Sequence, residues 1–486
     1  MRYDMNKKEK QLLKEQKELK KLRIAQSTPD YRGYFFMMIG LVLLFQFLDM
    51  MATTIWNNLQ EVIVRDFAGL SHDADISQGA AGYQPYQDTL SKITIIQIIS
   101  YVFLGIVPFY KTLADKIGRR FLFIFNAGFL GVAMFLGGLT DNLYIFLIAS
   151  TVITFFTIHD MQILYIAECV PENKRGTWMG IVTAVGNAAA FVVIFLRLTA
   201  MNPDGTSGPI AWRGIYILVG VIGIVTFVLS ALFLRESRPF INSRIEYLEK
   251  TPEEREADKK NAAKSQGGIV PGFKLVFKNK QLLWLSVAMF LINAANNMVS
   301  AYNTSILSQN NFSTFEITIA LTASCATGII IGYIMGPIAD KISRKSAAII
   351  FGVLSALSFI GFAFGTPYFG TGAVGAIIAG ILFGVSMNSY NNILTIATLM
   401  LTESSPASMR SSIIGVSAFF RVSAVIAMAA SSAMFKFLPI GVVCTILSAP
   451  FLIGACVVIA LLTKETKGRT FDEIEADFNE TETTAA

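Results

Sequence analysis

Charged side chains inside long apolar runs are the residues of this sequence best suited to chemistry. Asp49 lies in the middle of the first run, His159 and Asp160 lie within the fourth, and Arg421 lies inside the eleventh. A charge at bilayer depth costs roughly 2.5 kcal/mol or more, so each of these groups is expected to face a cavity or a partner. A desolvated carboxylate near a base can change protonation as its access to water changes. Asp49, Asp160 and His159 are therefore candidates for groups that titrate within the membrane.

Each charged group also has a structural alternative. Asp49 is either a titrating group or one side of a helix–helix pair. Arg421 either binds an anionic group of a solute through two bonds or pairs with Asp49 or Asp160. Arg197 lies near the end of the fifth apolar run and is expected to extend its guanidinium to the membrane surface.

Amide side chains mark two further runs, the seventh and the tenth. Asn297 and Asn303 belong to the seventh, and Asn388 and Asn392 to the tenth. Because an amide both donates and accepts hydrogen bonds, these residues suit a solute rich in hydroxyl or carboxyl groups. Together with Gln162 in the fourth run they are the predicted substrate contacts, although each Asn could instead bridge two helices.

The whole chain has the composition of a membrane protein. Of its 486 residues 53% are hydrophobic and 15% charged, and the mean hydropathy is +0.54; a soluble domain carries about 25% charged residues. The apolar residues come in runs of about 20, the length of a bilayer-spanning helix. An all-α polytopic membrane protein is predicted. The net charge of +6 does not indicate nucleic acid, because Lys and Arg cluster in the loops expected on the cytoplasmic side.

Twelve spanning runs are expected, in two bundles of six. The first run is expected to end near Asn58, before an outer loop of roughly thirty residues that includes Glu61 and Asp66. Both termini are placed in the cytoplasm. The expected parts are a tail, a first bundle, a charged linker, a second bundle and a second tail: 1–32, 33–234, 235–281, 282–462 and 463–486.

Two short charged turns orient the chain. LADKIGRR, which contains Asp115, and IADKISRK, which contains Asp340, each lie between apolar runs. Such a turn cannot lie in hydrocarbon, and its bases place it at the cytoplasmic face. A second repeat joins Glu168, Pro171 and Arg175 to Glu403, Pro406 and Arg410, each pair 235 positions apart (403 − 168 = 235). Parallel repeats of this kind predict two halves that alternate access around a central site.

These motifs resemble the major facilitator superfamily, and within it the sugar-porter-like branch. Besides the two turns, KETKGRT near the C-terminal end is similar to the branch's PETKGR signature, with Lys464 in place of the proline. RESRPF, which begins at Arg235, is similar to a rearranged PESPR. The resemblance implies twelve helices in two pseudo-symmetric bundles and a charge network that latches the halves together at the cytoplasmic face. The residues implied for this latch are Asp115, Arg119, Arg120, Glu168, Arg175 and Glu236 in the first half, with Asp340, Arg344, Glu403, Arg410 and Glu465 in the second.

The resemblance also implies a function. Asp49 falls where proton-coupled sugar porters carry an Asp, whereas Ile148 stands where they carry a base, so His159 and Asp160 are the expected substitutes. The predicted protein is a monomeric secondary transporter in the cell membrane. It moves a sugar, sugar acid or other organic acid by proton symport. The alternatives are a transporter-like nutrient receptor, or a uniporter or exporter of another metabolite.

An enzyme is not expected. The sequence has no glycine-rich phosphate loop in a soluble domain, no cluster of metal-ligand spacings and only two His. Cys169, Cys325, Cys444 and Cys456 are spaced neither as a disulfide framework nor as a metal site. No cofactor and no metal are therefore predicted, and the expected partners are the solute, protons and the lipid bilayer.

Overall fold

The structure is a computed structural model, and its described part contains helices and turns. It describes residues 7–27, 32–71, 74–106, 110, 117–157, 165, 169–170, 172–200, 212–251, 254, 269–405, 413, 416 and 419–466.

Helices occupy all twelve predicted runs in the described part of the chain, which confirms the predicted all-α fold. Eight of them are long and apolar enough to cross a bilayer, and three apolar segments are shorter: Leu143–Phe156, Ala184–Arg197 and Phe420–Met434. The first half contains α2 (Arg32–Phe67), α3 (Tyr83–Phe103), η1 (Leu104–Ile106), α5 (Arg119–Leu139), α6 (Leu143–Phe156), α8 (Glu172–Ala200) and α9 (Trp212–Phe233). The second half contains α13 (Lys280–Ser300), α14 (Asn303–Gln309), α15 (Thr314–Lys341), α16 (Arg344–Gly365), η2 (Thr366–Tyr368), α17 (Ala373–Glu403), η4 (Phe420–Ser423), α19 (Ala424–Met434) and α20 (Ile440–Leu462).

The expected end of the first span is wrong. Helix α2 continues to Phe67, so Glu61 belongs to the helix and is buried there, not in a surface loop. The helix can continue because Arg65 lies one turn after Glu61 and its Nε donates to Oε1 at 3.0 Å. The seventh span differs in another way, since it is divided into α13 and α14 at Ala301 and Tyr302.

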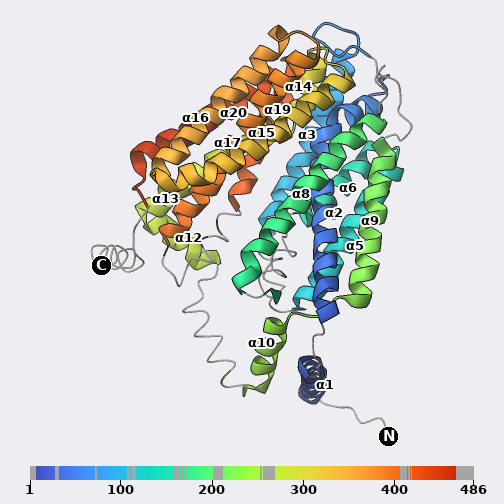
Figure 1. Cartoon of the computed structure of the whole chain (residues 1–486), viewed down its shortest axis with the longest axis vertical. Helices are drawn as coiled ribbons and strands as arrows, with labels where there is room; N and C mark the ends of the chain where they lie inside the picture. Colours follow the sequence, from blue (N-terminus) through green and yellow to red (C-terminus); the bar gives the residue numbers. More distant parts are fainter. Residues whose placement is uncertain are drawn as a thin grey trace.

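The helices of each half pack in matching pairs. Helix α5 packs on α6 and α9 in the first half, as α16 packs on α17 and α20 in the second. Between the halves, α3 packs on α19 and α8 on α15, two contacts that a twofold axis would exchange; α2 also contacts α14. Figure 1 shows the two halves close together near α14 and farther apart toward α1, α10 and α12. We call these two ends the α14 end and the α1 end.

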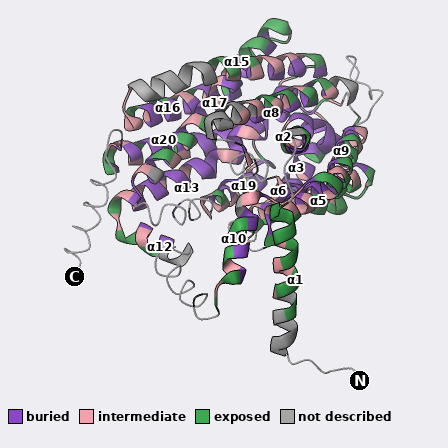
Figure 2. Ribbon diagram, turned by 60° about the horizontal axis from the view of Figure 1, so that its bottom comes forward, coloured by how far each residue is buried: buried purple, intermediate pink, exposed green. Residues whose placement is uncertain are grey.

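Small residues allow close contact between helices. A Cβ at Gly223 of α9 would lie 2.4 Å from the Cα of Gly131 on α5, so neither position has room for a side chain. Such glycine contacts are typical of helices that associate within a bilayer. Buried residues line the faces on which helices meet, and exposed ones lie on the outward faces (Figure 2).

Three further helices lie at the α1 end: α1 (Lys7–Ser27), α10 (Arg238–Glu249) and α12 (Ile269–Lys278). Helix α1 packs beside α10 through polar contacts. Arg244 Nε lies 2.8 Å from Glu18 Oε1, and Arg23 lies 2.7 Å from Glu249. The first tail and the linker are therefore joined to each other at this end.

Candidate functional site

A cavity of about 290 Å³ lies between the two halves. The first half lines it from α2 and α8, and the second half from α13, α14, α15 and α17. Its polar side chains are amides, hydroxyls and one thiol: Thr54, Asn57, Asn58, Asn187, Ser300, Asn303, Ser324, Cys325 and Asn388. The lining therefore offers many hydrogen-bond donors and acceptors without a formal charge.

The cavity brings two of the predicted substrate contacts together. Asn388 Nδ2 donates to the carbonyl of Gly384 one turn earlier, at 2.8 Å, which leaves Oδ1 as an acceptor. Gly328 on α15 makes room for this amide, because a Cβ there would lie 2.7 Å from Nδ2. Asn303 is 4% exposed, and its Oδ1 has no hydrogen-bond partner in the described part of the chain. Both residues keep unused capacity for a solute.

Three lining amides were not among the predicted contacts. Asn57 and Asn58 lie on α2 and Asn187 on α8, in the first half of the protein. Amides inside the first and fifth apolar runs were the signal that could have identified them. The prediction placed all its asparagines in the second half, whereas the lining is shared by both halves.

Two other predicted contacts belong to a separate polar cluster. The Tyr101 hydroxyl on α3 donates to Asn297 Oδ1 at 3.3 Å, and the Tyr390 hydroxyl donates to the Ile292 carbonyl at 3.2 Å. Arg421 on η4 is exposed and lies within electrostatic range of both tyrosine hydroxyls. This cluster joins α3, α13, α17 and η4, so Arg421 and Asn297 lie near each other but outside the lining of the cavity.

Asn392 and Asp49, the other predicted residues of the membrane interior that the structure describes, do not line the cavity. Asn392 Nδ2 donates to the Asn388 carbonyl at 2.8 Å, one turn beyond the cavity lining. Asp49 is 6% exposed on α2. His159, Asp160 and Gln162 lie outside the described residues.

At the α1 end of the first half, Glu236 binds the start of α5. Its carboxylate accepts the backbone N–H of Arg119 at 2.9 Å and that of Arg120 at 3.2 Å, and also the N–H of Ser237 at 3.1 Å. A carboxylate at a helix N-terminus satisfies backbone donors that have no partner within the helix. Burial raises the pKa of the Glu236 carboxyl, and these three N–H groups act against that rise.

The second half repeats this arrangement. Glu465 accepts the N–H of Arg344 at 2.9 Å and of Lys345 at 3.1 Å, at the start of α16. The two helix starts are 225 residues apart (344 − 119 = 225), and the two glutamates 229 (465 − 236 = 229). Glu403 adds a 3.6 Å contact to the Arg344 guanidinium. The contacts quoted for these two glutamate clusters each stay within one half.

The other predicted latch residues cannot be placed to the same degree. Arg175 belongs to α8 and Asp340 to α15, but their side chains lie outside the described structure. Asp115, Glu168 and Arg410 lie outside the described residues altogether.

The comparisons with known proteins agree with this architecture. Residues 33–422 match the family described as the Major Facilitator Superfamily. The chain belongs to this superfamily. It is therefore a multi-pass membrane transporter and not an enzyme. A search of the curated proteins found no match.

Solved structures with the same fold include several transporters of this superfamily. The inward-open xylose transporter XylE from E. coli shares 15% identity, with 91% of this chain and 99% of that chain covered, at a TM-score of 0.61. The nucleoside transporter NupG shares 10%, with 87% and 98% covered, at 0.60. A bacterial homolog of the human lysosomal transporter Spinster, inward-facing and unoccupied, shares 11%, with 89% and 96% covered, at 0.56. At such identities the likeness shows the fold alone.

A buried ion network lies at the α14 end of the protein. The Glu61 carboxylate binds Arg65 at 3.0 Å and Arg197 of α8 at 2.5 Å, and it accepts the hydroxyl of Ser308 from α14 at 2.8 Å. Arg197 is fully buried, so the expectation that it reaches the membrane surface is wrong. Arg197 can stay buried because its ion pair with Glu61 compensates the guanidinium charge inside the protein. Through Ser308, the second half of the protein also contacts the network.

More hydrogen bonds join the two halves of the protein beside this network. The hydroxyls of Tyr86 and Ser305 lie 2.8 Å apart, and Ser305 donates to Gln60 Oε1 at 2.9 Å. Ser91 of α3 donates to the Ser432 carbonyl of α19 at 2.5 Å. These contacts close the two halves against each other at the α14 end.

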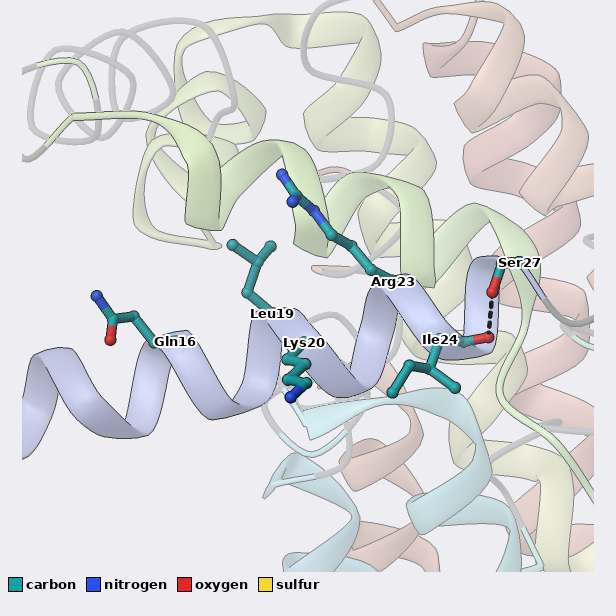
Figure 3. A pocket seen from close by; sticks show the side chains of 6 residues that line it. All are labelled: Gln16, Leu19, Lys20, Arg23, Ile24 and Ser27. Atoms are coloured by element: carbon teal, nitrogen blue, oxygen red, sulfur yellow. Dashed lines mark hydrogen bonds between the residues drawn. The ribbon is translucent and has the colours of Figure 1, made fainter.

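A hollow of about 420 Å³ lies on the surface of α1 and is not a transport site (Figure 3). All of its lining residues belong to that one helix: Gln16, Leu19, Lys20, Arg23, Ile24 and Ser27. Most of these residues are exposed, and the hollow is far from the contact between the two halves of the protein.

Proposed function

We propose that this protein is a secondary active transporter that moves a small polar solute by alternating access between its two halves. The observation that carries the proposal is the cavity of about 290 Å³ lined by both halves, next to contacts that close the α14 end. A solute bound between two bodies can be exposed at either end when the bodies rock. Two of the solved structures with this fold are described as inward-open or inward-facing, which supports taking the α1 end as the open, inner one.

The preferred substrate class is a hydroxyl-rich solute such as a sugar. Amides and hydroxyls line the cavity, and such groups recognise hydroxyls through paired donors and acceptors. The xylose and nucleoside transporters with the same fold carry solutes of that kind, as their names state. An acidic solute would need a cationic contact, and the nearest predicted one, Arg421, belongs to the neighbouring tyrosine cluster.

We propose proton symport with Asp49 as a coupling group. A buried carboxylate on the same helix as Thr54, Asn57 and Asn58 is well placed to respond to solute in the cavity. The two glutamate clusters at the α1 end are the proposed latch. In this state each glutamate binds a helix start of its own half. We propose that residues of the two clusters pair across the halves when the α1 end closes.

Uptake by the purified protein in liposomes tests this function. Sugars, sugar acids and organic acids are supplied with and without an inward pH gradient, and accumulation of at least one class against its gradient is expected. Uptake that ignores the pH gradient would exclude symport, and no uptake of any class would exclude the proposed substrates.

Asn388→Ala is expected to weaken uptake or binding of the identified solute by about fivefold. The variant removes one amide contact, worth about 1 kcal/mol. Asn293→Ala is the matched control, because Asn293 is buried on α13 and makes the same 2.8 Å bond to a carbonyl one turn earlier but does not line the cavity. Equal losses in both variants would contradict the placement of the site.

A further inference from the structure

The Glu61 network separates the cavity from the α14 end. The Asn58 side chain lines the cavity, and its backbone carbonyl accepts a hydrogen bond from Arg197 Nη1 at 2.7 Å. Ile194, one turn before Arg197 on α8, lines the cavity as well. A solute moving between the cavity and the α14 end therefore has to pass the place where Glu61, Arg197 and Ser308 meet.

The network is charged, buried and shared between the halves. Glu61, Arg65 and Arg197 are at most 5% exposed. The Ser308 hydroxyl donates to Glu61 and accepts from Arg65 Nη2 at 2.9 Å. One hydroxyl of the second half is therefore hydrogen-bonded to both an acid and a base of the first half. Among the described residues, Glu61 is the buried carboxylate that forms ion pairs with both guanidinium groups. A buried cation left without its carboxylate is strongly destabilising until water reaches it.

In the described part of the chain, the groups around Glu61 come from four helices. Arg65 lies on α2, Arg197 on α8, Ser308 on α14 and Tyr86 on α3. Asp75, in the turn before α3, is a further acid within electrostatic range of Arg65, and it is itself exposed to solvent. Glu61 is thus the buried acid of this network, and its charge decides whether the network is balanced.

From this geometry we infer that Glu61 is a second coupling acid, whose protonation releases the contact between the halves at the α14 end. This inference rests on the proposed alternating access. While Glu61 is ionised, Ser308 and both arginines bind it and the α14 end stays closed. When Glu61 takes up a proton, Arg65 and Arg197 lose their counter-charge, and opening of this end lets water solvate them. Proton uptake and access from the α14 end are then one event.

The accessibility of a reporter cysteine tests this inference without a known substrate. The reporter is Ser305→Cys, a buried position of α14 at the contact between the halves, placed in a full-length background from which the native cysteines are removed: Cys169, Cys325, Cys444 and Cys456. Labelling by a maleimide is measured on the purified protein between acidic and neutral pH. Each rate is divided by that of the exposed reporter Ser71→Cys, which cancels the pH dependence of the thiol itself.

The normalised rate is expected to rise about tenfold as the pH falls, and to be high and independent of pH in Glu61→Gln. Asp88→Asn is the matched control, since it neutralises a partly exposed acid near the start of α3, at the same α14 end, and should leave the pH profile unchanged. Ser308→Ala removes the contact across the halves but keeps the charges, so it should raise labelling at neutral pH. It also serves as the second variant if Glu61→Gln does not fold.

Two results would overturn the inference, and they are distinguishable. If labelling of Ser305→Cys occurs but does not depend on pH, the role of Glu61 is refuted while alternating access stands. If no variant is labelled at any pH, the α14 end does not open, and the proposed transport cycle fails together with the inference.

Discussion

Gly118 shows how a single residue fixes the first glutamate cluster. Its φ is +112°, a backbone conformation that residues with a side chain rarely adopt. A Cβ at this position would also lie within van der Waals overlap of Glu236 Oε2. The glycine of the predicted turn therefore allows the Glu236 carboxylate to approach the first N–H groups of α5, a reason that the sequence motif alone does not supply.

Gly118→Ala is expected to destabilise the protein more than Gly69→Ala does. Both positions have positive φ, but nothing lies within 4 Å of a Cβ at Gly69, so only backbone strain of about 1 kcal/mol is added there. At Gly118 the displaced carboxylate adds to this strain, for a total of about 2 kcal/mol or more. Thermal unfolding of the two purified variants measures the difference, and equal melting temperatures would argue against the contact.

At the scale of elements, α1 is held on α10 by exposed charges. Arg244 binds Glu18 through two bonds of 2.8 and 3.3 Å, and Gln26 Nε2 donates to Asn242 at 3.0 Å. The hydrogen bond to Glu18 raises the pKa of Arg244. Exposed pairs contribute only about 0.2–1 kcal/mol each and are screened by salt, so this docking is expected to be weak.

Hydrogen exchange of the α1 backbone is expected to accelerate in Glu18→Ala and in high salt. Both changes remove the attraction between α1 and α10 while the bundle stays intact. The control is Glu246→Ala, which removes the 2.8 Å pair with Lys250 at the end of α10 and should leave α1 as protected as before. Exchange in α1 that ignores both salt and Glu18→Ala would show that the helix is held in another way.

For the whole molecule, the central expectation is that the α14 end must open during transport. A short cross-link between Ser91→Cys and Ser432→Cys, whose parent residues are hydrogen-bonded across the halves, should abolish uptake. Ser355→Cys with Ser386→Cys is the matched control, because these serines exchange hydrogen bonds of 2.9 and 3.0 Å within the second half. Uptake that survives the first cross-link, or stops with the second, would contradict motion of the halves as rigid bodies.

The sequence by itself determined where the apolar helices lie along the chain, their order and the internal repeat, although it did not give the end of the first helix or the break in the seventh span. A bilayer demands about 20 apolar residues for each crossing helix, and it confines charged turns to its surfaces, so local composition was sufficient. The spacing of 225 residues between Arg119 and Arg344 could likewise be obtained from the sequence. The roles predicted for Asp49 and Arg421 in transport remain predictions.

Only the tertiary structure decided which polar groups meet. Glu61 and Arg197 are 136 positions apart, and Asn187 faces the same cavity as Asn388 from the opposite half. Such meetings depend on how each helix is rotated and on which end of the bundle is closed. An apolar run fixes where a helix lies in the bilayer, but the packing of distant helices fixes which of its faces meets a partner.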